Sequence, residues 1–174
     1  MPSRIFSLSE HEAALELVPS FRDQFLAAAD ACNQACMQED CEVMVESCFR
    51  SFARQQEAYA KGRKLVGTQW IEDGTGIVTR ATPGRSPHQY RLAGHLVLRD
   101  AATGEWLQGG KVPDARWGRI VGRAAKVRGL VWGGDFRGLF DGCHVESPTW
   151  RAVAERYRWR GLPVDLDPAG VLLD

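Results

Sequence analysis

The sequence predicts one domain in which helices and short strands alternate along the chain. Apolar residues recur at helical spacing from residue 20 to about 38, whereas residues 42–46 alternate between polar and apolar as in a half-buried strand. The chain has 174 residues, of which 44% are hydrophobic, and this is enough for a sizeable core. We therefore expect residues 1–174 to fold as a single unit without internal repeats.

The expected helices begin and end at recognisable capping residues. Ser9 and Glu12 have the spacing of a capping box, which predicts a short first helix that ends at Pro19. Ser51 is a suitable N-cap for a later helix, and Gly129 is a suitable terminator for another. Besides the first helix, the expected set is residues 20–38, 52–61, 113–129 and 151–160.

Strands are expected in the segments between these helices. Residues 100–104 have the composition of a hairpin turn that leads into a short strand. Residues 67–75 are rich in turn residues, and residues 162–174 are expected to form a surface tail. The expected strands are residues 42–46, 77–79, 92–99, 105–107, 130–136 (a strand and a tight turn) and 141–146.

The charge balance argues against one class of partner. Lys and Arg together number 22, as do Asp and Glu, and the sequence pI is about 6.9. A neutral chain lacks the global positive field that non-specific nucleic-acid binding requires. The arginines of the second half are spaced as on a solvated helix face. We therefore expect no nucleic-acid partner.

The N-terminus and the cysteines indicate the cellular compartment. The sequence shows no signal-peptide pattern, and no apolar run approaches the roughly 18 residues of a membrane span. The five cysteines are an odd number, and the cluster at Cys32, Cys36 and Cys41 lacks the usual spacing of a metal site. We expect synthesis in the cytoplasm, no membrane partner, no disulfide framework and mainly buried cysteines.

Three of the four histidines lie in two short patches rich in turn residues. His88 and His95 lie in residues 86–95, and His144 lies in residues 141–146. A catalytic zinc ion takes three protein ligands and keeps an open position for water, and neutral imidazole is a preferred ligand. Three histidines satisfy that count. The alternative is that they are ordinary hydrogen-bonded or surface residues, which is the commoner role of a single histidine.

The spacing of the first two histidines requires a bend between them. In one helix, His88 and His95 would lie roughly 10 Å apart along the axis, and on one strand their odd separation would point them to opposite faces. A loop from Pro83 to about Arg91, followed by a strand over residues 92–99, would let His88 fold back over His95. Only a broken segment of this kind allows the two rings to reach one ion.

Four blocks of residues between about 40 and 150 carry a resemblance to a known family. They are Phe49-Arg50-Ser51 with Gln55 and residues 59–63, then residues 78–88, then residues 129–136, and finally Asp141 with His144. In this order and spacing they resemble the VanY-type D-Ala-D-Ala carboxypeptidase and phage L-alanyl-D-glutamate endopeptidase family of zinc peptidases. The resemblance implies an α+β fold of the hedgehog/D-Ala-D-Ala peptidase type, in which a small antiparallel sheet flanked by helices carries one zinc ion. Residues 41–150 would hold the catalytic blocks, between an N-terminal helical region (1–40) and a C-terminal helix and tail (151–174).

The resemblance also assigns roles by position. His88, His95 and His144 take the places of the metal ligands, Asp141 that of the general base, and Arg50 that of the arginine that stabilises the oxyanion. The remaining candidates are Gln55 and Ser86, as substrate contacts or residues that support the site, and Glu146, either as a rival base or as a residue that orients a histidine.

Two positions depart from the family pattern. Arg91 stands where the family has glycine, and His95 stands where the family has an aspartate ligand. The second change makes the metal site more positive by one charge. A zinc ion on three neutral histidines can still lower the pKa of its bound water to about 7. We therefore expect activity to be retained, with metal loss or a changed metal preference as the alternative.

The resemblance implies a zinc-dependent peptidase that acts on the peptidoglycan stem peptide, and we expect it to be a monomer that cuts the L-Ala–D-Glu bond. In a bacteriophage endolysin, release through a holin-type pore would bring the enzyme to the cell wall. One alternative is a D-Ala-D-Ala carboxypeptidase, because the sequence does not choose the bond. Another is a peptidoglycan-binding or virion structural module that does not hydrolyse its ligand.

Overall fold

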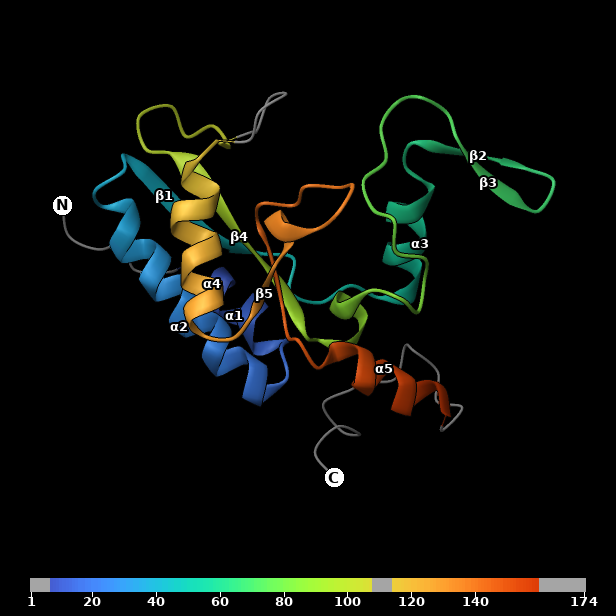
Figure 1. The fold of residues 1–174 in the computed structure, drawn as a ribbon, viewed down its shortest axis with the longest axis horizontal. Helices are drawn as coiled ribbons and strands as arrows, with labels where there is room; N and C mark the ends of the chain where they lie inside the picture. Colours follow the sequence, from blue (N-terminus) through green and yellow to red (C-terminus); the bar gives the residue numbers. More distant parts are fainter. Residues whose placement is uncertain (1–6, 108–113, 160–174) are drawn as a thin grey trace.

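Two N-terminal helices pack against the first strand of the central sheet (Figure 1). The structure is a computed structural model that describes residues 7–107 and 114–159. Helix α1 spans Leu8–Leu15 and helix α2 spans Pro19–Cys36. We expected Pro19 to end the first helix, but it begins the second, where its missing N–H costs nothing and its fixed φ suits the first helical turn.

The capping box of α1 lies two residues before the one that the sequence suggested. The Ser7 side chain accepts a hydrogen bond from the Glu10 N–H, and the Glu10 carboxylate accepts one from the Ser7 N–H at 2.8 Å. The prediction of Ser9 and Glu12 was wrong for a tertiary reason. Glu10 is buried, and its other carboxylate oxygen accepts a hydrogen bond from the Val45 N–H of the neighbouring strand at 3.0 Å.

A four-stranded antiparallel sheet forms the centre of the fold, as the predicted α+β class requires. Its order is β1-β4-β6-β5, with each neighbouring pair antiparallel. The strands are β1 (Cys41–Glu46), β4 (Ala93–Asp100), β6 (His144–Glu146) and β5 (Val131–Trp132). The first two agree with the predicted strands to within one residue. The expected strand at 141–146 forms only over its last three residues.

The core lies between α2 and the β1–β4 pair. The apolar face of α2 is buried as its helical spacing predicted, and Phe25 is completely inaccessible. Gly94 of β4 allows the helix to approach, because a Cβ atom there would lie 2.7 Å from the Phe25 ring. Burial of a phenylalanine of this kind contributes about 1.5–3 kcal/mol. Four of the five cysteines are buried, as expected.

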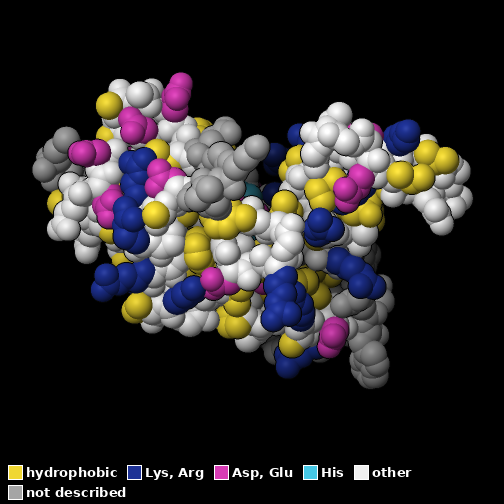
Figure 2. All heavy atoms as spheres, turned by 45° about the horizontal axis from the view of Figure 1, so that its top comes forward, with side chains coloured by type: hydrophobic (Ala, Val, Ile, Leu, Met, Phe, Trp, Pro, Cys, Tyr) yellow, Lys and Arg dark blue, Asp and Glu magenta, His cyan; other side chains and the backbone are white. Residues whose placement is uncertain are grey.

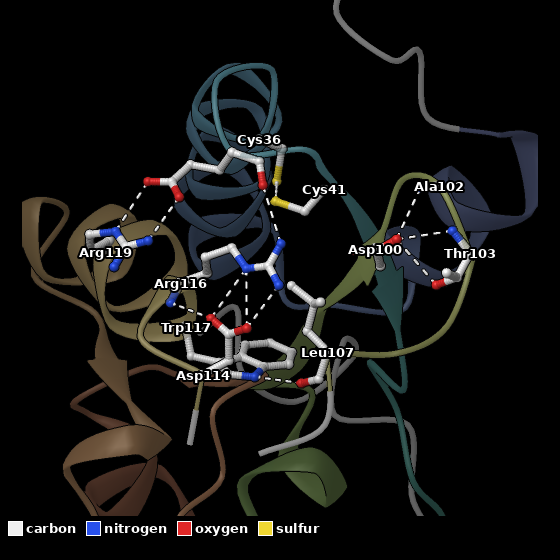
Figure 3. Close-up of polar contacts among 11 residues, drawn as sticks. Cys36, Cys41, Asp100, Ala102, Thr103, Leu107, Asp114, Arg116, Trp117 and Arg119 are labelled. Atoms are coloured by element: carbon white, nitrogen blue, oxygen red, sulfur yellow. Dashed lines mark hydrogen bonds and ion pairs between the residues drawn. The ribbon is translucent and has the colours of Figure 1, made fainter. Parts of the chain in front are cut away.

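Polar contacts connect the helical segment that follows Asp114 to the residues at the end of α2 (Figure 3). Arg116 donates to both carboxylate oxygens of Asp114 and to the carbonyl of Glu39, which follows α2. Arg119 forms an ion pair with the Glu39 carboxylate at 2.8 Å. The segment continues as a π-helical turn η2 (Gly118–Gly122) and helix α4 (Arg123–Val127), within the helix predicted at 113–129. Pro113, its expected first residue, lies outside the described residues.

Helix α3 and a hairpin form a lobe beside the sheet (Figure 1). Ser51 caps α3 (Phe52–Ala60) as predicted, accepting a hydrogen bond from the Arg54 N–H at 3.3 Å. The hairpin of β2 (Arg63–Val66) and β3 (Gln69–Glu72) was not predicted, although Gly67 provides the positive φ that its turn needs.

Residues 77–79 are not a strand, which corrects another prediction. Their β-branched composition favours extended backbone, but no neighbouring strand pairs with them in the described structure. Residues 105–107 contribute only an isolated bridge, between Arg99 and Trp106. Helix α5 (Trp150–Trp159) closes the described chain, and the tail expected at 162–174 lies outside the described residues. None of the described helices is both long and apolar enough to cross a bilayer.

Candidate active site and metal centre

Three structural elements bring the three histidines of the predicted metal site together. His88 lies in a 3-10 turn, η1 (Pro87–Tyr90), whereas His95 lies in β4 and His144 is the first residue of β6. The predicted bend between the first two is present, because Arg91 follows η1 with a left-handed φ of 57°. His95 and His144 are register partners across the β4–β6 pair. The ring centroid of His88 lies 4.8 Å from that of His95 and 5.0 Å from that of His144.

Hydrogen bonds at the outer nitrogens determine which nitrogens face each other. Nδ1 of His88 lies 3.4 Å from the carbonyl oxygen of Cys48, and Nε2 of His144 lies 2.8 Å from the carboxylate of Glu146. Both of these oxygens act as acceptors, so the two nitrogens are assigned as N–H donors. The other nitrogens, Nε2 of His88 and Nδ1 of His144, then carry lone pairs, and they lie 3.2 Å apart.

The donor set fits a metal ion. Two nitrogen ligands of one tetrahedral zinc ion lie about 3.3 Å apart, given Zn–N bonds of about 2.0–2.1 Å. The distance of 3.2 Å between Nε2 of His88 and Nδ1 of His144 matches this spacing. One nitrogen from each of the three histidines lies within 4.8 Å of the others. A cation between the rings would also remove the repulsion between two lone pairs that face each other.

The environment keeps at least two of the imidazoles neutral. Burial lowers the pKa of His88 well below its usual value, and the proximity of His95 and His144 lowers it further. Burial, followed by the electrostatic effect of the neighbouring His144, lowers the pKa of His95 to about 3. Metal ligation requires the unprotonated form of the ring. His88 and His95 can therefore bind a cation at neutral pH without first losing protons.

Glu146 holds His144 in place. One of its carboxylate oxygens contacts Nε2 of His144 at 2.8 Å, and the other accepts a hydrogen bond from the Trp150 indole at 2.9 Å. The residue is 3% exposed. Because both oxygens already have partners, this carboxylate is arranged to orient an imidazole, in the manner that is common around metal ligands.

Asp141 lies beside His95 and Cys143. Its carboxylate, the Cys143 sulfur and a nitrogen of His95 lie within 4.8 Å of one another. Cys143 donates a hydrogen bond to Oδ1 of Asp141 at 3.2 Å, which leaves Oδ2 for another partner. Glycine is needed at Gly133, because a Cβ atom there would lie 2.5 Å from the Asp141 carbonyl oxygen and 2.8 Å from the His144 Cβ.

Arg50 and Gln55 form a connected pair at the edge of the site. Arg50 donates through Nη1 to Oε1 of Gln55 at 3.1 Å, and Nε2 of Gln55 donates to the carbonyl of Ala81 at 2.8 Å. The Gln55 side chain is completely buried. Burial lowers the pKa of Arg50, whereas the nearby charge of Asp141 raises it. Ser86 is buried next to η1 and also lines the cleft.

These groups lie at a cleft with a volume of about 710 Å³. Its lining includes all three histidines and the other predicted site residues except Gln55, which supports Arg50 from behind. Figure 2 shows the hollow between the body that contains the sheet and the lobe that contains α3.

Several supporting residues were not identified from the sequence. The carbonyl of Cys48, the thiol of Cys143, the indole of Trp150 and the absent side chain of Gly133 all position site groups. Of these residues, only Cys143 could have been identified from the sequence, because it lies between Asp141 and His144. The others act through backbone atoms or across elements, and local sequence patterns do not report such contacts.

Comparisons with known proteins agree with this geometry. Two family models, both described as D-alanyl-D-alanine carboxypeptidase, match residues 79–147 and 19–112, and the second of these is the VanY model, which covers more than half of the chain. The chain is 33% identical over 123 residues to the peptidoglycan L-alanyl-D-glutamate endopeptidase CwlK of Bacillus subtilis, covering 68% of each protein.

A solved structure shares the fold. The Serratia marcescens L-Ala D-Glu endopeptidase ChiX matches with a TM-score of 0.54 and 20% sequence identity, over 88% of this chain and 96% of that one. The fold, the histidine group and the sequence matches lead to the same assignment. The chain belongs to the family of VanY-type D-alanyl-D-alanine carboxypeptidases and L-alanyl-D-glutamate endopeptidases, which are metallopeptidases that act on peptidoglycan.

Proposed function

We propose that this chain is a zinc-dependent peptidoglycan endopeptidase that hydrolyses the bond between L-alanine and D-glutamate in the stem peptide. The observation that carries the proposal is the convergence of His88, His95 and His144 beside Asp141, whose Oδ2 has no hydrogen-bond partner among the described residues. The choice of bond rests on the similarity to CwlK, whose name states that specificity.

The three histidines would hold the metal. When bound, zinc supplies a Lewis acid that polarises the peptide carbonyl and lowers the pKa of a water molecule. Glu146 and the Cys48 carbonyl fix the orientation of His144 and His88, so each ring presents its lone pair to the same point. This preorganisation avoids the cost of ordering the ligands when the metal binds.

Asp141 is the proposed general base. Because Cys143 occupies Oδ1, we assign proton transfer to Oδ2, which would take a proton from the attacking water and return it to the leaving amine. Glu146 is a poorer candidate, since both of its oxygens are already hydrogen-bonded and it is buried.

Arg50 is the proposed stabiliser of the oxyanion. It lines the cleft, and its hydrogen bond to Gln55 holds the guanidinium group at the edge of the histidine site. A positioned donor of this kind stabilises the negative charge that develops on the carbonyl oxygen. Gln55 would therefore act through Arg50, and Ser86 would contribute to the wall against which the peptide lies.

A second candidate function is D-Ala-D-Ala carboxypeptidase, because both matching family models carry that description. Mass spectrometry of purified peptidoglycan after digestion separates the two functions. The endopeptidase exposes new N-terminal glutamate, whereas the carboxypeptidase releases free D-alanine. A His144→Ala variant is the negative control. Binding to cell walls without either product would support the non-hydrolytic module.

The biological setting remains a prediction from the sequence resemblance. We propose a monomeric bacteriophage endolysin that reaches the wall through a holin-type pore. Size-exclusion chromatography with light scattering tests the monomer. Induced expression in a bacterial host, with and without a co-expressed pore protein, tests the release: lysis only with the pore supports it, and lysis without the pore contradicts it.

A further inference from the structure

The cleft concentrates positive charge in a chain whose formal charges balance. Five arginines line it, against two carboxylates, Asp141 and Glu146, although Lys+Arg and Asp+Glu each number 22 in the whole sequence. The five are Arg50, Arg80, Arg85, Arg137 and Arg151. A cleft with one dominant sign of charge concentrates ligands of the opposite sign. This distribution points to an anionic substrate.

Three of these arginines are available to a ligand. Arg80, Arg85 and Arg137 are exposed, and their side chains form no hydrogen bond or ion pair with any other described residue. Arg50 is different, because it already donates to Gln55. Arg151 is also engaged, since its guanidinium group lies 4.7 Å from the centre of the Trp150 ring.

The three available arginines come from two segments that border the histidine group. Arg80 and Arg85 precede η1, the turn that carries His88. Arg137 lies between η3 (Gly133–Asp135) and β6, the strand that carries His144. In Figure 1 the first segment descends beside α3 and the second forms the loop above β5. A peptide bound across the histidines would therefore have guanidinium groups near it on more than one segment.

The chemistry of the proposed substrate provides the matching group. A glutamate within a peptide uses its amino group and one of its two carboxyl groups in peptide bonds. The second carboxyl group remains, and it is negatively charged unless it is amidated. In an L-alanyl-D-glutamate substrate this carboxylate belongs to the residue whose amino group leaves. Arginine binds carboxylates through two parallel N–H donors, which makes it well suited to read this group.

We propose that Arg80, Arg85 and Arg137 make the enzyme selective for stem peptides whose glutamate carboxylate is free over peptides in which that group is amidated. This inference rests on the proposed endopeptidase function. It adds a chemical feature of the substrate and three specificity-determining residues. These arginines are not required for bond cleavage, so the amidated peptide is still hydrolysed, but more slowly.

Two synthetic stem peptides that differ only in this group test the proposal. One carries the free glutamate carboxylate and the other carries its amide, and kcat/KM is measured for both with the zinc-loaded protein. We expect the wild type to prefer the free carboxylate roughly tenfold, as one charge-assisted hydrogen bond provides. The variant with Arg80→Gln, Arg85→Gln and Arg137→Gln should lower this ratio to about one while it retains activity on the amide. Arg123→Gln, an exposed arginine of α4 outside the cleft, should leave the ratio unchanged.

The outcomes separate this inference from the function on which it rests. Equal cleavage of both peptides by the wild type, or an unchanged ratio in the triple variant, overturns the selectivity and leaves the endopeptidase function intact. Cleavage of neither peptide by the wild type overturns the proposed function and this inference together.

A salt series on the wild type gives an independent measurement should the triple variant fail to fold. Salt screens the attraction between exposed charges. Raising sodium chloride should therefore lower kcat/KM for the carboxylate peptide more than for the amide. Parallel salt dependences for the two peptides contradict the proposal.

Discussion

Nε2 of His88 lies 3.2 Å from Nδ1 of His144, although the two residues are 56 positions apart in the chain. Each ring is fixed from behind, His88 by the Cys48 carbonyl and His144 by the Glu146 carboxylate. The facing nitrogens therefore point two lone pairs at one another. In a protein without a cation this arrangement is unfavourable, and a bound metal ion makes it favourable.

Removal of one ring should remove the metal. We expect His144→Ala to bind less than about one tenth of the zinc of the wild type and to lower kcat/KM by roughly 10³-fold or more, because the metal supplies several kcal/mol of charge stabilisation. Zinc content by mass spectrometry and hydrolysis of purified peptidoglycan measure the two effects. The control variant His11→Ala changes the fourth histidine, which lies in α1. It should keep the zinc content and the activity of the wild type. Full zinc content in His144→Ala would contradict the proposed ligand set.

Replacement of the proposed base should separate chemistry from metal binding. Asp141→Asn keeps the shape of the side chain but cannot take a proton, so we expect kcat to fall about 10²–10⁴-fold with zinc content unchanged. Steady-state kinetics and metal analysis of the same preparation provide the comparison. An active Asp141→Asn variant would move the role of base to another carboxylate.

Replacement of Glu146 should weaken metal binding and leave the chemical step intact. Glu146→Gln cannot accept the same charged hydrogen bond from Nε2 of His144, so we expect zinc affinity to fall about 10–100-fold. With saturating zinc, kcat should remain close to that of the wild type. Competition with a chromophoric chelator measures the affinity. A large loss of kcat at saturating zinc would instead identify Glu146 as the base.

The metal-free protein should lose stability in acid. The folded state lowers the pKa of His88 well below 6.5 and that of His95 to about 3, so the unfolded chain binds protons that the folded chain does not. Stability is therefore highest above pH 6.5 and declines as the pH falls toward 3, by up to about 1.4 kcal/mol per pH unit for each histidine. Urea unfolding between pH 7.5 and 4 measures this slope. His95→Asn should reduce the slope of stability against pH. An equal slope in that variant would refute the lowered pKa of His95 as a cause of the acid sensitivity.

The buried amide of Gln55 should contribute both to stability and to catalysis. Gln55→Met leaves a donor on Arg50 and the carbonyl of Ala81 without their partner, and we expect a loss of about 1–3 kcal/mol in the free energy of unfolding. Because Arg50 also loses its positioning contact, kcat should fall more than KM rises. Gln56→Met, on the neighbouring and half-buried residue, is the matched control. Equal effects of the two substitutions would show that Gln55 has no special role.

Much of the fold could be predicted because its signals are local. Helical spacing placed α2, and the cap at Ser51 placed α3. The β2–β3 hairpin was missed because its strands are short and mostly exposed, so they lack the alternation that marks a half-buried strand. The capping box was misplaced because a contact with β1 decides which glutamate is used.

The sequence by itself determined that three histidines lie in two turn-rich patches, and its resemblance to the family named Asp141, Glu146 and Arg50 as their candidate partners. The tertiary structure gave the two carboxylates different surroundings: Glu146 lies against His144 and Trp150, whereas Oδ2 of Asp141 has no hydrogen-bond partner among the described residues and its carboxylate lies beside His95. The pairing of β4 with β6 sets His95 opposite His144, and the turn at Arg91 folds His88 onto both. Such distances depend on strand register and on burial, which are set by contacts between segments far apart in the chain, and residue spacing along the sequence carries no record of them.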